Sequence, residues 1–109
     1  MLVIQADHNE VQKKMKTFAG GDTKKLLDYA AINSRSQTVV AGDSDIIMEF
    51  SKVCTENQLK CMVLAATHAF HSKHMDPMLE KYRDVAKTTK ATRTQSCDYI
   101  SSIGSMCLE

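Results

Sequence analysis

Three histidines spaced three residues apart are the side chains best suited to chemistry in this chain. His68, His71 and His74 lie within residues 68–78, together with Phe70. Histidine titrates near neutral pH, so it can carry protons in catalysis or bind a metal ion. The surroundings of the three must decide between proton transfer, metal binding and surface residues without a chemical role.

The spacing of the histidines disfavours a metal site on a regular element. On a helix, positions i, i+3 and i+6 drift around the axis, because three residues fall short of one turn. On a strand, the same spacing places side chains on alternate faces. A zinc site built from the three histidines and Cys61 would therefore need an irregular loop, and the sequence contains no recognised zinc spacing. We expect no metal ligands here, and zinc analysis would settle this alternative.

The elements that must position the histidines alternate between strand and helix patterns. β-prone runs occupy residues 2–6, 27–32, 38–41 and 61–66. Two amphipathic helices are predicted between them: one follows an N-cap at Asp7 and ends at Gly20, and one is capped by Ser44 and ends near Asn57. The order β-α-β-β-α-β is typical of the split βαβ, ferredoxin-like pattern.

The predicted fold class is therefore α+β: one four-stranded antiparallel sheet with two helices on one face, plus a C-terminal helix and tail. Asp76 and Pro77 form an N-cap and first-turn pair for that third helix, whose apolar positions lie in residues 79–86. Residues 87–97 are polar and predict a loop, and residues 99–103 predict one more strand. The fold alone implies no function.

Composition excludes several classes of protein. The chain has 14 basic and 13 acidic residues, a formal net charge of +1 and no dense Lys/Arg block, so neither nucleic acid nor a membrane surface is favoured. The apolar run at residues 1–6 is too short for a signal or a membrane span. The cysteines form no C-x-x-C pair, which favours free thiols and a cytoplasmic location. They are Cys54, Cys61, Cys97 and Cys107.

Two segments resemble a known enzyme family. Residues 67–79 closely resemble the H-A-F-H-S-x-x-M-x-P-x-L motif of malonyl-type acyltransferase domains, and residues 31–42 are similar to the N-S-P-x-Q-x-V-[IV]-[SA]-G segment of the same family. These domains occur in polyketide synthases and animal-type fatty acid synthases, and are related to malonyl-CoA:acyl carrier protein transacylases. The two matches have the family's usual separation, and residues 98–102 resemble its return into a larger subdomain.

The resemblance implies unequal roles for the residues of the motif. His71 would be the catalytic base, taking a proton from a serine hydroxyl and later giving it to the departing thiol. His68 and Phe70 would line the acyl pocket. In this family H-A-F-H is associated with malonyl units, and the phenyl ring would fill the space of a C2 methyl group, worth about 1–3 kcal/mol of discrimination. Asn33 would line the substrate channel, although a role in the hairpin turn explains it equally well.

Three positions depart from the family pattern. Arg35 and Lys73 stand where proline is common, and His74 stands where leucine is common. None of these changes touches the chemistry that the resemblance implies, so we expect His74 to be an exposed bystander.

The nucleophile implied by the resemblance is missing. The family's serine lies in a G-x-S-x-G elbow, and the nearest sequence, residues 42–46, lacks the final glycine. Ser44 is better explained as a helix cap. The oxyanion donors and the arginine that pairs with the malonyl carboxylate would lie in the larger subdomain. The resemblance therefore implies a small ferredoxin-like subdomain at residues 1–86, then a linker and returning strand at residues 87–109, inactive alone.

The partners implied are those of an acyltransferase. They are the larger subdomain with its serine, the coenzyme A thioester of the substrate malonyl-CoA, and the phosphopantetheine thiol of an acyl carrier protein. We expect no cofactor on this segment, and no nucleic acid or membrane partner. The alternative is a free-standing ferredoxin-like module that docks a carrier protein or regulates a partner. If the motif faces a shared cleft, His71 and Phe70 should be solvent-accessible in the chain alone.

Overall fold

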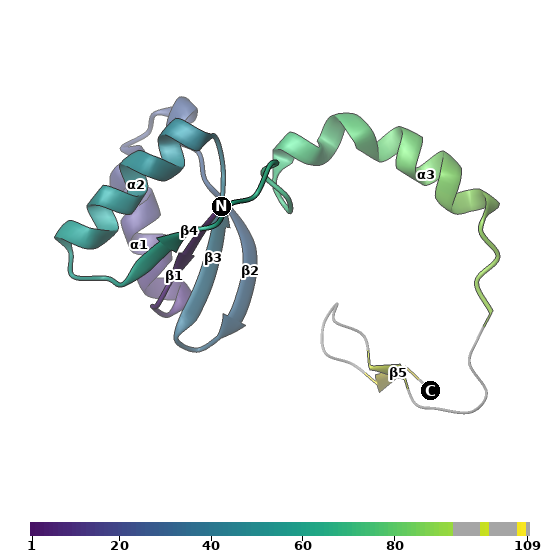
Figure 1. Ribbon diagram of the computed structural model, residues 1–109, viewed down its shortest axis with the longest axis horizontal. Coiled ribbons are helices and arrows are strands. Elements are labelled where there is room, and N and C mark those ends of the chain that lie inside the picture. Colours follow the sequence, from purple (N-terminus) through teal and green to yellow (C-terminus); the bar gives the residue numbers. More distant parts are fainter. Residues whose placement is uncertain (93–98, 101–106, 109) are drawn as a thin grey trace. The chain divides into compact units, whose positions relative to one another are not determined.

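A four-stranded antiparallel sheet with two helices on one face forms the first part of the protein (Figure 1). The structure is a computed structural model that describes residues 1–92, 99–100 and 107–108. It divides into two units, residues 1–79 and residues 80–109. The histidine segment belongs to the first unit.

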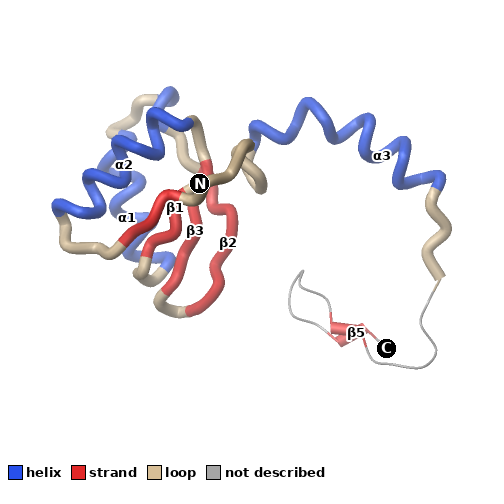
Figure 2. The backbone as a smooth tube through the Cα atoms, viewed as in Figure 1, coloured by secondary structure: helices blue, strands red, loops and turns tan. Residues whose placement is uncertain are grey.

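The strands of the first unit follow the order β2-β3-β1-β4 across the sheet, and every neighbouring pair is antiparallel. The strands are β1 (Leu2–Ile4), β2 (Asp28–Ser34), β3 (Gln37–Ala41) and β4 (Cys61–Val63). The helices are α1 (His8–Ala19) and α2 (Ser44–Glu56), with short 3-10 helices η1 (Thr23–Lys25) and η2 (Lys73–Met78). This arrangement, visible in Figure 2, confirms the predicted α+β ferredoxin-like fold.

The central strand β1 carries the inner face of the sheet. Leu2 pairs with Val40 on one side and with Val63 on the other, and both Leu2 and Ile4 are fully buried. Since successive residues of a strand point to opposite faces, these two side chains share the face that the helices cover. Val3 between them belongs to the open face and is half-buried.

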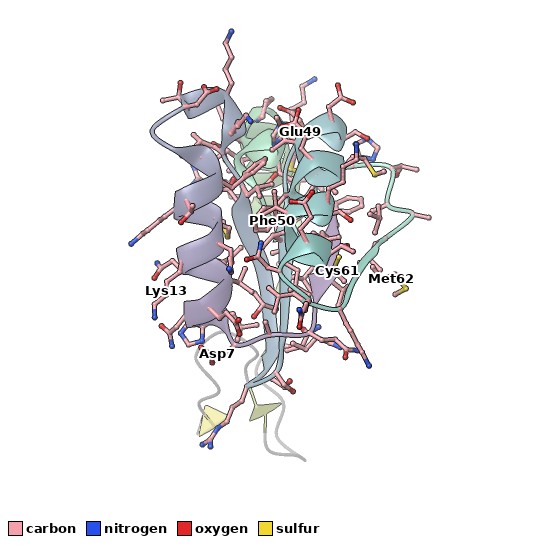
Figure 3. All side chains as sticks on the ribbon, turned by 90° about the vertical axis from the view of Figure 1, so that its left-hand side faces the viewer. Asp7, Lys13, Glu49, Phe50, Cys61 and Met62 are labelled. Atoms are coloured by element: carbon pink, nitrogen blue, oxygen red, sulfur yellow. The ribbon has the colours of Figure 1, made fainter. Side chains whose placement is uncertain are left out.

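Aromatic and aliphatic side chains from both helices fill the space above that face. Phe50 of α2, labelled in Figure 3, is fully buried. Its ring centroid lies 5.2 Å from that of Phe18 on α1, so the two rings join the helices. Val11 and Ile47 complete the contact with the sheet. The one buried polar side chain among the described residues, Thr38, donates its hydroxyl proton to the carbonyl oxygen of Ala6 at 3.0 Å.

The start and end signals of α1 act as predicted. The Asp7 carboxylate accepts a hydrogen bond from the backbone amide of Asn9 at 2.8 Å, and Gly20 ends the helix in the left-handed conformation, with φ of 54°. For α2 the predicted cap is wrong by one residue. Asp43 is the N-cap and Ser44 is already helical, because the carbonyl of Asp43 accepts the first helical hydrogen bond, from Ile47.

The segment after β4 differs from its prediction at both ends. The strand stops at Val63 instead of continuing to residue 66, since the chain there leaves the edge of the sheet. Helical structure begins at Lys73, ahead of the predicted cap at Asp76, as the 3-10 helix η2, which Ser72 caps. Asp76 and Pro77 therefore lie inside a 3-10 helix instead of opening an α-helix.

The predicted C-terminal helix is present as α3 (Leu79–Thr88). Its first residue, Leu79, is the last residue of the first unit. In the second unit, β5 (Tyr99–Ile100) pairs with β6 (Cys107–Leu108) in antiparallel register. Of the strand predicted at residues 99–103, only residues 99–100 are described, and residues 93–97 of the predicted loop lie outside the described part. Within the described residues, no helix has the length and apolar character needed to cross a membrane.

Candidate active-site segment

The histidine segment crosses one end of the sheet from edge to edge. After β4, the amide of Leu64 donates to the carbonyl of Met1 at 2.9 Å, next to the central strand. The amide of Lys73 then donates to the Asp28 carboxylate at 3.0 Å, at the start of the opposite edge strand β2. Residues 65–72 therefore bridge the ends of the strands, and together with Leu64, Lys73 and His74 they form the histidine crossing.

His71 lies in the middle of this crossing in an uncommon backbone conformation. Its φ is 60°, in the left-handed region that non-glycine residues rarely adopt. Such a conformation costs on the order of 1–3 kcal/mol and persists only where the surrounding structure determines it. Both His71 and Phe70 are exposed, as expected if the motif faces a shared cleft.

The two residues predicted to line an acyl pocket lie together. The rings of His68 and Phe70 are 5.6 Å apart and tilted by 43°, an ordinary geometry for an aromatic pair. The Thr67 hydroxyl lies 2.9 Å from Nδ1 of His68, a hydrogen bond that orients the ring. These two rings and His71 thus come from one short exposed stretch.

Asn33 is not brought to this stretch. It lies five positions along β2 from Asp28, which corresponds to about 16 Å at the rise of a strand. Its side-chain amide donates to the Gln37 side-chain oxygen at 2.9 Å, next to the turn between β2 and β3. This contact supports the hairpin role, and the channel role of Asn33 stays a prediction.

His74 is bonded, contrary to the expectation of an idle side chain. Its Nε2 donates to the Asp43 carboxylate at 2.9 Å, at the start of α2. Nothing in the sequence marks Asp43 for this contact, because an aspartate before a helix is ordinarily explained by capping alone. The anchoring carboxylates of Asp28 and Asp43 are therefore the functional candidates that sequence reasoning missed.

A shallow depression of about 310 Å³ adjoins the segment. Its lining includes His68 and His74 from the crossing and residues from the start of α2, but not His71. The depression therefore does not include the proposed base.

Other nucleophiles and ligands contribute little. Burial raises the pKa of the Cys54 thiol to about 11, so this thiol is protonated at neutral pH. Among the described residues, no group of three or more His, Cys, Asp or Glu side chains could hold a metal ion.

The chain is similar in sequence to parts of polyketide synthases. No protein-family model matches the chain. It is 32% identical over 88 residues to the polyketide synthase GfsA of Streptomyces halstedii, which covers 81% of this chain and 1% of that protein. It is 39% identical over 80 residues to the conidial yellow pigment biosynthesis polyketide synthase of Emericella nidulans, covering 73% of this chain and 3% of that protein. The chain therefore spans a few per cent of these curated relatives.

Solved structures decide which part of such proteins is matched. The acyltransferase domain from the second module of the salinomycin polyketide synthase is 26% identical with a TM-score of 0.78, over 98% of this chain and 24% of that one. The chain therefore matches one part of a polyketide synthase acyltransferase domain. FabD from Acinetobacter baumannii has the same fold, with a TM-score of 0.80 at 18% identity. The matched region corresponds to about a quarter of the salinomycin domain.

Proposed function

We propose that this chain supplies the histidine base of an acyltransferase that moves a malonyl unit from coenzyme A to the phosphopantetheine thiol of an acyl carrier protein, through a serine ester. The observation that carries the proposal is the position of the H-A-F-H motif, residues 68–71, on an exposed crossing of a fold that matches an acyltransferase domain over 98% of the chain. The serine would come from outside this segment.

The two half-reactions use the imidazole of His71 in opposite directions. In the first, His71 accepts the serine proton while the serine oxygen attacks the malonyl thioester carbonyl. The carbon–sulfur bond breaks and the proton passes to the coenzyme A sulfur. In the second, His71 accepts the proton of the phosphopantetheine thiol, the sulfur attacks the serine ester, and the proton returns to the serine oxygen as the carbon–oxygen bond breaks.

Selection of the malonyl unit is assigned to the aromatic pair. The Phe70 ring, held 5.6 Å from the His68 ring, would occupy the space that a C2 methyl group needs. One methyl group is worth about 1–3 kcal/mol in such a pocket, so the preference for malonyl is expected to be incomplete.

The chain alone should not form an acyl-enzyme. An imidazole base without its nucleophile and oxyanion donors retains little of the rate enhancement. Incubation of the 109-residue chain with malonyl-CoA should therefore give no covalent adduct by mass spectrometry. A stoichiometric adduct on Ser44 or Ser72 would contradict this proposal.

A chimera tests the positive part. Residues 1–92 would replace the matching segment of the salinomycin acyltransferase domain, which carries the rest of the domain. The chimera should transfer malonyl groups, and His71→Ala should abolish transfer. His8→Ala, which removes a half-buried histidine at the start of α1, outside the motif, is the matched control and should leave transfer unchanged.

The same experiment distinguishes the acyltransferase role from the alternative role as a docking module. A folded chimera whose transfer rate is the same with and without His71 would refute the role of the base. Binding of an acyl carrier protein to the 109-residue chain would then favour the docking module.

A further inference from the structure

Three aspartates precede helices in the first unit, and one of them is used differently. Asp7 accepts a hydrogen bond from the amide of Asn9 at 2.8 Å, and Asp22 accepts one from the amide of Lys24 at 2.9 Å. Both satisfy amides that a helix start leaves free. Asp43 makes no such side-chain bond to its own helix, α2.

The Asp43 carboxylate instead contacts the histidine crossing. Its Oδ1 accepts a hydrogen bond from Nε2 of His74 at 2.9 Å, across 31 positions of sequence. The second anchor has the same chemistry, because the Asp28 carboxylate accepts the amide proton of Lys73 at 3.0 Å. Carboxylates from two separate elements therefore hold two successive residues that follow His71 closely.

Ser72 closes the stretch between these anchors and His71. Its hydroxyl donates to the carbonyl of Ala69 at 2.5 Å, and its oxygen accepts the amide proton of His74 at 3.3 Å. The bond from Ser72 to Ala69 spans His71, and the bond from His74 to Ser72 links this short loop to the anchors. The φ of 60° at His71 is disfavoured unless its surroundings impose it.

We propose that Asp28 and the Asp43–His74 pair are positioning residues that fix the backbone of His71 for proton transfer, an inference that rests on the proposed function. The pair acts on the base through Ser72 and has no contact with the reacting atoms. Leucine, the common family residue at position 74, cannot donate a hydrogen bond to Asp43. The pair is therefore expected in this chain and not throughout the family.

Removal of the pair should leave the fold intact. The side chains of His74 and Asp43 are 46% and 67% exposed, and ion pairs this exposed contribute little to global stability. The helices and the sheet are held by separate buried contacts around Phe50. The effect of a substitution should therefore be confined to residues 69–74.

Backbone NMR relaxation of the 109-residue chain measures that effect directly. Asp43→Ala and His74→Ala should each lower the order parameter of the His71 amide from about 0.85 to below about 0.6. Asp43→Asn keeps an acceptor oxygen and should restore most of the order. Asp45→Ala, which removes an exposed carboxylate from the same helical turn without a bond to His74, is the matched control and should change nothing.

The proposal would be overturned if the order parameter of the His71 amide were unchanged in both Asp43→Ala and His74→Ala. An equal fall of that order parameter in Asp45→Ala would also overturn it. Unfolding of His74→Ala would also overturn it, because the proposed role is local. If Asp43→Ala alone unfolds, His74→Ala tests the same bond from the other side.

Kinetics of the chimera separate this inference from the proposed function. Asp43→Ala and His74→Ala should lower kcat about tenfold with little change in KM, since the base is displaced and the substrate contacts remain. Lost order with unchanged kcat would overturn the positioning role. If His71→Ala then also left kcat unchanged, the proposed function itself would fail. If the His71 amide stays ordered in Asp43→Ala and His74→Ala while transfer by the chimera depends on His71, the positioning role is refuted and the proposed function stands.

Discussion

The layer between the helices and the sheet differs from the histidine crossing in what holds it together. In the layer, large apolar side chains such as Phe50, Leu2 and Ile47 are buried almost completely. In the crossing, His68, Phe70 and His71 are exposed, and hydrogen bonds to carboxylates fix the backbone. Fold stability and site geometry therefore depend on different interactions, and substitutions should affect them separately.

Phe50→Ala should have the largest effect on stability. Phe50 is fully buried against Phe18, and its truncation removes the ring that joins both helices, at a cost of about 3–5 kcal/mol. Urea denaturation of the chain measures this loss. Phe70→Ala is the matched control: its ring is 42% exposed, so the change should stay within about 0.5 kcal/mol. Equal losses in the two variants would contradict the separation of layer and crossing.

Thr38→Val should have an intermediate effect. The substitution keeps the shape of the side chain but leaves the carbonyl of Ala6 without its 3.0 Å partner in a fully buried position, costing about 1–3 kcal/mol. Thr17→Val is the control, because its hydroxyl makes a similar bond to a helix carbonyl on the exposed surface of α1. A loss at Thr17 as large as that at Thr38 would show that burial does not set the cost.

The layer was largely predictable from sequence because its signals are local and periodic. The apolar spacing of Val11, Met15 and Phe18 and the cap at Asp7 predict α1, and the β-branched run at residues 38–41 predicts β3. The errors lie at the ends of elements. Ser44 and Asp43 are both good caps, and their order along the chain does not say which one a helix will use.

The crossing was predictable in composition but not in geometry. The motif identifies His71, His68 and Phe70, yet no local pattern predicts a positive φ at a histidine or the bonds from Asp28 and Asp43. Those contacts join residues 45 and 31 positions apart, and depend on how the strands come together.

The two caps Asp7 and Asp43 offer the smallest and most selective test. Hydrogen bonding to the amide of Asn9 is the largest influence on Asp7 and lowers the pKa of its carboxyl below 3.8, a shift that the nearby His8 reinforces. The folded pKa is thus lower than the unfolded one. The stabilisation is complete above the unfolded pKa and is lost as pH falls through the folded value.

Stability measured by urea denaturation should therefore fall less between pH 5 and about pH 2 in Asp7→Asn than in the unmodified chain. Asp45→Asn removes a carboxylate without a capping bond and should keep the unmodified dependence. An unchanged acid dependence in Asp7→Asn would mean that the Asp7 carboxylate does not stabilise α1 and that the contrast with Asp43 is one of geometry alone.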